Sequence, residues 1–265
     1  MNTHPLMKRR ITYFLITSFF LISTILAVLF FLVICRIGTV NIQNCTYSSE
    51  QNVLDSSKAK VGMHIYAIDK EKMERKIKES NPYVSDVYIT RTGLRTLNIT
   101  LTEDKPNFYI EQNGKFIILS QTLRVLEIVS SRAEAVAKNA AQISLPPIND
   151  AVLREELSFK SDHTEYYDGE CIGVLSAIAD SSLSGKITYA DLSEKFNIRV
   201  TYKDKYEIRL GSPKDIEEKL TLVSETITFL EDPINRFSTA KGIIHASVAG
   251  ETSFEATGSI SSSTP

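Results

Sequence analysis

The sequence predicts an α+β protein with one N-terminal transmembrane helix, a small strand-helix-helix-strand-strand unit and a larger mixed β-sheet domain with packed helices. Three observations support this fold class. An apolar run without any charge occupies residues 11–35. Residues 36–106 place two helix patterns between extended ones, and residues 107–256 continue with strand patterns interrupted by helices. Strand and helix patterns in this arrangement are typical of α+β domains.

The apolar run is long enough to cross a membrane. As a helix its 25 residues would span about 37 Å, against a hydrocarbon core of ~30 Å. A cleaved signal peptide has an apolar region of roughly 7–15 residues and a small-residue cleavage site, which Cys35-Arg36-Ile37 does not provide. We therefore expect a retained anchor.

The charges that flank this run predict its orientation. Three basic residues precede the run and one follows it closely, namely Lys8, Arg9, Arg10 and Arg36. Because positive flanks stay inside, residues 1–10 are expected in the cytoplasm and everything after the run outside it. All 32 acidic residues and 27 of the 30 basic ones follow the run, which gives this part a formal net charge of −5. Such a balance disfavours a nucleic-acid partner.

The small unit opens with an extended pattern at 37–43. Ser48 and Gln51 have the spacing of a capping box, so a short helix is expected to begin there. After this helix, residues 65–68 are expected to form a brief extended piece.

A second helix and two strands complete the small unit. Asp69 is the predicted cap of a helix over "KEKMERKIKES", which ends before Pro82 because proline disfavours helix in the preceding residue. Residues 79–103 then give two strands around a corner at Gly93. Apolar and polar residues alternate along them, so one face of the sheet should be buried.

The larger domain is predicted to begin with a β-hairpin, because Asn113-Gly114 in "FYIEQNGKFIIL" is a strong two-residue turn signal. Residues 129–160 give no clear pattern. A modest helix is expected in "ECIGVLSAIADSSL", and three successive strands are expected in "KITYADL", "KFNIRVTY" and "YEIRLG".

A long amphipathic helix is predicted after these strands. Ser212 is expected to cap it, with Pro213 at its first position. Its apolar stripe consists of Ile216, Leu220, Val223, Ile227 and Leu230. A last strand is expected at 241–248. The tail from Ala249 should lack regular structure, with 257–265 disordered, although Phe254 is expected to pack back on the domain.

The residues do not favour an enzyme. Ser57-Lys58-Ala59-Lys60 fits the S-x-x-K pattern of serine/lysine hydrolases, and Ser161-Asp162-His163 resembles S-D-N. That chemistry needs a desolvated lysine, but the Ser57 segment is a polar helix end. No two histidines have helical metal-ligand spacing. The sequence therefore predicts no catalytic residue, no cofactor and no metal site.

The cysteines of the exported part predict neither a disulfide nor a metal site. Cys45 and Cys171 match neither a disulfide pattern nor a metal pattern, so we expect both to be unpaired.

An ordered set of short motifs runs through residues 8–256. In the small unit the set comprises Pro82, Val84, Arg91, the strand Thr96–Glu103 and Pro106. In the larger domain it comprises Leu145-Pro146, "ITYADLSEKFNIRV", "YEIRLGSPKDIEEKLTLV" and Gly242-Ile243-Ile244 with Phe254. This set resembles the FtsQ/DivIB family of bacterial cell-division proteins, and the small unit resembles that family's POTRA domain. The chain departs from the family at three places, namely Gly93-Leu94, residues 120–123 and His245.

The resemblance implies a non-catalytic component of the divisome. Family members are single-pass membrane proteins of the division septum. They bind FtsB/DivIC- and FtsL-type partners, and through them they couple to the septal peptidoglycan synthase. The alternative is another exported POTRA-containing adaptor in protein secretion or envelope assembly, and a serine/lysine hydrolase stands third.

The last strand is the candidate partner-binding site, because a partner can add a strand to an exposed sheet edge. We expect such an edge from Gly242 to Val248. The candidate residues are Gly242, Ile243, Ile244, Ala246, Val248 and Phe254. An ordinary core strand explains the same pattern equally well, since natural edges are usually blunted.

Overall fold

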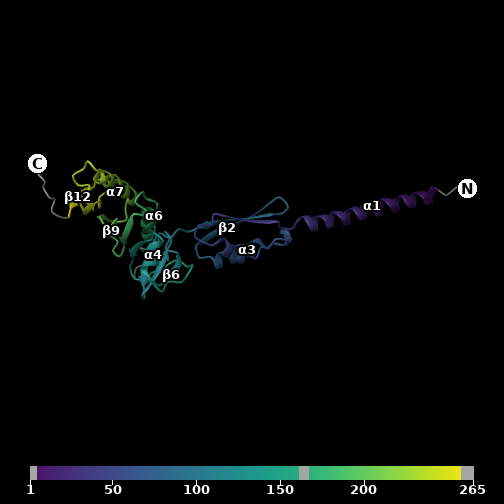
Figure 1. Cartoon of the computed structure of the whole chain (residues 1–265), viewed down its shortest axis with the longest axis horizontal. Coiled ribbons are helices and arrows are strands. Elements are labelled where there is room, and N and C mark those ends of the chain that lie inside the picture. Colours follow the sequence, from purple (N-terminus) through teal and green to yellow (C-terminus); the bar gives the residue numbers. More distant parts are fainter. Residues whose placement is uncertain (1–4, 161–166, 258–265) are drawn as a thin grey trace. The chain divides into compact units, whose positions relative to one another are not determined.

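The computed structural model describes residues 5–160 and 167–257. The chain divides into two compact units, Met1–Glu103 and Asp104–Pro265, each with its own hydrophobic core (Figure 1). Among the described residues, one helix is long and apolar enough to cross a membrane. This helix, α1, runs over Pro5–Ile34, and its segment Tyr13–Ile34 has a mean hydropathy of 2.6. It is consistent with a single-pass membrane anchor.

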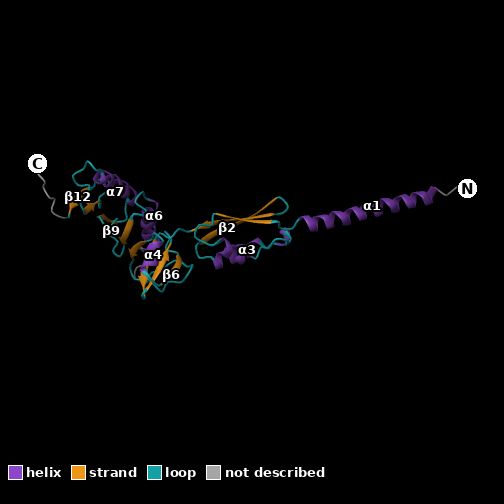
Figure 2. Ribbon diagram, viewed as in Figure 1, coloured by secondary structure: helices purple, strands orange, loops and turns teal. Residues whose placement is uncertain are grey.

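The rest of the first unit contains β1 (Thr39–Gln43), α2 (Glu50–Ser57), a 3-10 helix η1 (Ile65–Ala67), α3 (Lys70–Ser80), β2 (Val84–Thr92) and β3 (Thr96–Glu103). The described strands form one sheet in the order β1-β3-β2, with β1 parallel and β2 antiparallel to β3. Helix α3 lies against one face of this sheet (Figure 2). The alternating apolar residues of β2 and β3 pack there against Met73 and Ile77.

The predicted order of elements in this unit is confirmed, and two details are corrected. Of residues 65–68, predicted as extended, Ile65–Ala67 form the turn of η1 instead, and Ile68 is extended. The capping box of Ser48 and Gln51 does not form, because α2 begins after Ser49, whose side chain makes no capping bond. The Asp69 cap is confirmed, since its carboxylate accepts a 3.0 Å hydrogen bond from the backbone N–H of Lys72.

The second unit contains β4 (Phe108–Gln112), β5 (Lys115–Leu119), β6 (Val125–Val129), α4 (Arg132–Ala137), β7 (Ala141–Ser144), a one-turn π-helix η3 (Tyr167–Cys171), α6 (Ile172–Asp180), β8 (Ile187–Asp191), β9 (Ile198–Tyr202), β10 (Tyr206–Gly211), α7 (Ile216–Glu231), β11 (Gly242–His245) and β12 (Ser253–Ala256). Its described strands form one nine-stranded mixed sheet in the order β12-β11-β10-β9-β8-β7-β4-β5-β6. The apolar side chains of β8 to β11 form a core with those of α6 and α7.

The predicted hairpin and the three successive strands are confirmed as β4–β5 and β8–β10. The short strands β6 and β7 lie in or next to the stretch that gave no clear pattern. Helix α7 begins at Ile216, later than the predicted cap at Ser212, because Asp215 adopts a left-handed conformation with φ of 55°. All five residues of its predicted apolar stripe are buried.

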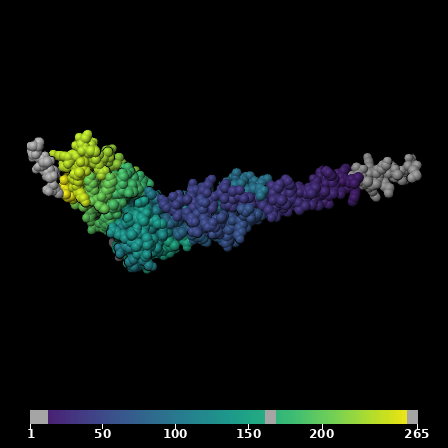
Figure 3. Space-filling model, in the orientation of Figure 1, coloured from purple at the N-terminus to yellow at the C-terminus, as the bar shows by residue number. Residues whose placement is uncertain are grey.

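The predicted sheet edge is wrong in one respect. Strand β11 is not the edge, because it pairs with β10 on one side and with β12 on the other. The missing element was β12, which comes from the tail that the sequence predicted to be irregular. Figure 3 shows the last described residues, in yellow, at the surface of the second unit. The rest of the predicted disordered tail, 258–265, lies outside the described residues.

Candidate partner-binding site

Strand β12 is an open end of the nine-stranded sheet, since no described strand pairs with its outer side. The antiparallel register places Phe254 opposite Ile244, and the N–H of Thr257 donates to the Lys241 carbonyl at 2.8 Å. Because residues alternate between bonding and facing away in such a ladder, the N–H and C=O groups of Phe254 and Ala256 point outward. These groups can accept an added strand.

A close contact between β11 and β12 depends on the absence of a side chain at Gly242. A Cβ at this position would lie 2.5 Å from the Phe254 ring and would also meet the carbonyl oxygen of Glu255. The Phe254 ring instead lies edge-on to Tyr206, at 5.9 Å between centroids, and to Phe237, at 5.7 Å. Aromatic packing therefore fixes the edge strand on the core.

The six predicted site residues do not form one apolar surface. Ile244 and Ala246 belong to the core, with exposed fractions of 0% and 1%. Ile243 is half-buried, and Val248 is 62% exposed in the segment between β11 and β12. Of the six, Phe254 alone lies on the edge strand, and its ring packs against the backbone of Gly242.

Two pairs of polar side chains lie on the strands at this end of the sheet. The His245 imidazole lies 3.4 Å from the Glu255 carboxylate, which joins β11 to β12 across their register. On β10 the Arg209 guanidinium donates to Glu207 at 2.8 Å. The prediction that His245 is a surface imidazole agrees with this position. The His245–Glu255 pair borders β12, whereas the Arg209–Glu207 pair lies two strands away on β10.

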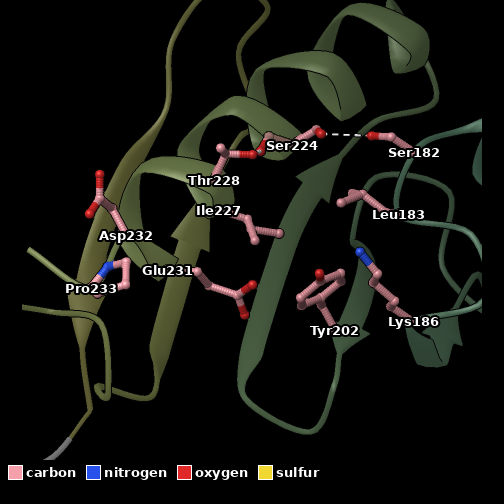
Figure 4. Close-up of a pocket in the computed structure, with 10 residues that line it drawn as sticks. All are labelled: Ser182, Leu183, Lys186, Tyr202, Ser224, Ile227, Thr228, Glu231, Asp232 and Pro233. Carbon is pink, nitrogen blue, oxygen red and sulfur yellow. Dashed lines mark hydrogen bonds between the residues drawn. The ribbon is translucent and has the colours of Figure 1, made fainter. Parts of the chain in front are cut away.

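A cavity of about 540 Å³ lies where α7 meets the β8–β9 side of the same unit (Figure 4). Glu231 accepts two hydrogen bonds from the Lys203 ammonium, at 3.1 and 3.3 Å, and this bonding raises the pKa of Lys203. On the opposite wall the hydroxyls of Ser182 and Ser224 are 2.6 Å apart. These bonds connect α7 to the sheet and to the chain after α6. None of these hydrogen bonds places a nucleophilic side chain next to a general base.

The serine/lysine pattern has a structural role. The buried Ser57 hydroxyl donates to the Leu54 carbonyl at 2.6 Å and accepts from the Ala59 N–H at 3.0 Å, so it closes the end of α2. Lys60 is exposed and therefore solvated. Ser161, Asp162 and His163 lie outside the described residues.

Metal ligands and cysteines give no further site in the described residues. Within 5–160 and 167–257, no three His, Cys, Asp or Glu side chains are grouped so as to hold a metal ion. Cys45 and Cys171 are both free in the structure. Burial raises the pKa of the Cys171 thiol to about 12, so this sulfur is a small apolar group in the core.

Comparison with known proteins identifies the type of chain. Residues 35–104 match the family model of the FtsQ-type POTRA domain. The chain is 24% identical over 185 residues to cell division protein DivIB of Clostridium acetobutylicum, with 70% of each chain covered. It is 21% identical over 210 residues to cell division protein FtsQ of Corynebacterium glutamicum, covering 78% of this chain and 85% of that one. Over 70% or more of its length, the chain is similar to FtsQ/DivIB-type cell division proteins.

Among solved structures, the chain matches the major extracytoplasmic domain of DivIB from Geobacillus stearothermophilus in its trans isomer. This match has a TM-score of 0.31 and 12% identity, and it covers 51% of this chain and 99% of the solved one.

In the unit that matches the FtsQ-type POTRA domain, one of the motif residues has a structural role. Glu103 ends β3 and accepts backbone hydrogen bonds from Thr46, Tyr47 and Ser48 at 2.6, 2.8 and 2.8 Å. Burial opposes ionisation of this carboxyl, but the bonds from Ser48, Tyr47 and Thr46 outweigh it and hold its pKa below the ordinary value of 4.5. The carboxylate thus fixes the loop that leads into α2.

Proposed function

We propose that this chain is a non-enzymatic component of the divisome that binds FtsB/DivIC- and FtsL-type membrane proteins outside the membrane. Through them it links the septal peptidoglycan synthase to cell division. The observation that carries the proposal is the similarity to DivIB and FtsQ over 70% or more of the chain. In this role α1 anchors the protein with residues 1–10 in the cytoplasm and both folded units outside, at the division septum.

The open edge at β12 supports a binding role. The outward N–H and C=O groups of Phe254 and Ala256 offer backbone hydrogen bonds to an added strand, and alternating side chains can select its sequence. We propose that a partner segment pairs there, next to His245 and Glu255. The predicted residues Ile243 and Val248 remain candidates for side contacts. The buried Ile244 and Ala246 act through the stability of β11.

A substitution on the outward side of β12 tests this pairing. Ala256→Pro removes an N–H that does not bond to β11, so β12 should stay in place while an added strand is blocked. The matched control Ala256→Ser keeps the N–H. In the native bacterium, co-purification of the FtsB/DivIC-type protein should be lost with Ala256→Pro and retained with Ala256→Ser. Equal recovery with both variants would place the partner elsewhere.

Localisation separates this proposal from the alternative adaptor. A fluorescent protein fused to the N-terminus should form a band at mid-cell and should rescue filamentation of cells depleted of the native copy. Uniform membrane label without rescue in the native bacterium would favour an exported POTRA-containing adaptor in secretion or envelope assembly.

A further inference from the structure

Strand β1 is a second open sheet edge, in the POTRA unit. The N–H of Thr39 donates to the Arg95 carbonyl, and β1 then pairs in parallel with β3 from Thr39 to Gln43. Because alternate residues of a parallel strand bond to one neighbour, the N–H and C=O groups of Val40 and Ile42 face away from β3. No described strand or loop pairs with these four groups.

A groove of about 960 Å³ runs beside this edge, between β1 and α2. Its apolar lining includes Val40, Ile42, Leu54, Val61 and Met63. Val61 is 71% exposed and Met63 is 42% exposed, so the groove presents apolar surface to the solvent. Open backbone groups beside apolar side chains are what an extended segment needs in order to bind.

One end of the groove lies close to the membrane anchor along the chain. The carbonyl of Ile37 accepts a hydrogen bond from the N–H of Gly62. The N–H of Ile37 donates to the carbonyl of Met63, and both bonds are 2.8 Å long. Ile37 follows the end of α1 at Ile34 by three residues. An occupant of this end must therefore be at the membrane surface.

The groove carries two lysines at one end and Glu50 at the other, with Asp55 on the α2 wall between them. The link through Ile37 places Lys58 and Lys60 at the end near the anchor, because α2 runs back along β1. Glu50 begins α2, just after the far end of β1. An occupant that is acidic near the membrane and basic further out complements this pattern.

We propose that this groove binds the extended juxtamembrane segment of another single-pass membrane protein, which adds to β1 as a parallel strand. Both chains leave the same membrane in the same direction, so the added strand runs with β1. The segment carries apolar residues at alternate positions, an acidic residue near the lysines and a basic residue near Glu50. This interface is separate from the β12 edge, and neither depends on the other.

The register argues against a second copy of this chain as the occupant. Two copies related by a two-fold axis along the strand direction would place Val40 at the same height as its counterpart. The N–H of each copy would then face the N–H of the other, and parallel pairing requires a shift of one residue. A different chain can adopt that shift.

Site-specific photo-crosslinking in the native membrane identifies the occupant. Benzoylphenylalanine replaces Met63 in the full chain, and the control replaces Tyr88, which is 57% exposed on β2 at the other edge of the same sheet. From Met63, the crosslinked peptide should map within roughly ten residues of the membrane span of another single-pass protein. No product, a product with lipid, with a soluble protein or with a second copy, or the same peptide from Tyr88, would overturn the proposal.

Two further variants test the mode of binding. Val40→Pro removes an outward N–H at an edge position where proline is tolerated, and the Met63 crosslink yield should fall about tenfold, whereas Val40→Ile should retain it. Val61→Glu places a charge on the exposed wall without touching the fold, and it should also lower the yield. Unchanged yields with Val61→Glu and with a folded Val40→Pro would exclude strand addition. Ala256→Pro should leave this yield unchanged, so that the two interfaces succeed or fail separately.

Discussion

Glu103 shows how one side chain can organise a segment far away in the sequence. Its carboxylate satisfies three successive backbone N–H groups at 46–48, before the start of α2. These groups lie in the loop before α2, where no helical carbonyl can bond them, so the carboxylate supplies the acceptor that they need. The motif residue at the end of the third strand is thus explained by the loop that it holds.

Replacing Glu103 by Gln should make the POTRA unit less stable by about 1–2 kcal/mol at neutral pH, because the hydrogen bonds lose their ionic acceptor. The folded pKa lies below 4.5, so the ionised form is favoured by folding. This contribution is complete above the unfolded pKa and is lost as pH falls through the folded value. The advantage of wild type over Glu103→Gln should therefore shrink below about pH 4.5.

Hydrogen exchange of the β3 amides in the full-length protein measures this difference across pH. Glu79→Gln is the control, since Glu79 is exposed at the end of α3. A stability difference between wild type and Glu103→Gln that does not change from neutral to acid pH would contradict the role assigned to the carboxylate.

Lys219 marks the limit of prediction from the sequence at this scale. The apolar stripe of α7 could be predicted from its spacing. A lysine on a helix, by contrast, is normally predicted to be exposed to solvent. Lys219 is 2% exposed, and its ammonium donates to the carbonyls of Leu210 and Ser212 at 3.0 Å each. Burial lowers its pKa. No local pattern in the sequence shows that the carbonyls of Leu210 and Ser212 accept hydrogen bonds from this side chain.

At the scale of elements, the sequence predicts well wherever a local signal exists. Asp69 as a cap and Asn113-Gly114 as a turn both lie where expected, because each acts on its own neighbours. Strand β12 has no such signal. Its four residues, Ser253–Ala256, form a strand only because β11 offers an edge and Gly242 leaves room for the Phe254 ring. The edge of the candidate site was therefore misplaced by one strand.

Gly242→Ala should detach β12. The added methyl group would meet the Phe254 ring and the Glu255 carbonyl, and overpacking of this kind costs about 1–3 kcal/mol. The amides of 253–257 should exchange faster, while those of β9 and β10 should change little. The control is Gly173→Ala within α6, where a Cβ meets nothing within 4 Å and helix propensity should improve. Slow exchange of β12 in Gly242→Ala would show that the aromatic contact tolerates the methyl group.

At the scale of the whole molecule, two separate cores follow one apolar helix. The helix and its flanking charges could be read from the sequence, because a membrane span depends on length and composition alone. The change of pattern around Glu103 to Pro106 predicts a domain boundary there. The two proposed binding edges, β1 and β12, could not be predicted from the sequence, because they depend on which backbone groups the completed sheets leave open.

The orientation of the chain should depend on three residues at its start. Replacing Lys8, Arg9 and Arg10 by Asn leaves Arg36 as the nearest positive charge, so the bias toward a cytoplasmic N-terminus is removed and a fraction of chains should insert in reverse. In these chains the POTRA unit stays inside and resists protease added to intact spheroplasts. The control removes the same charge from three exposed residues far from α1 in the sequence, namely Lys105, Lys115 and Lys160. Full digestion of both variants would mean that the folded units, and not the flanking charges, determine the direction of insertion.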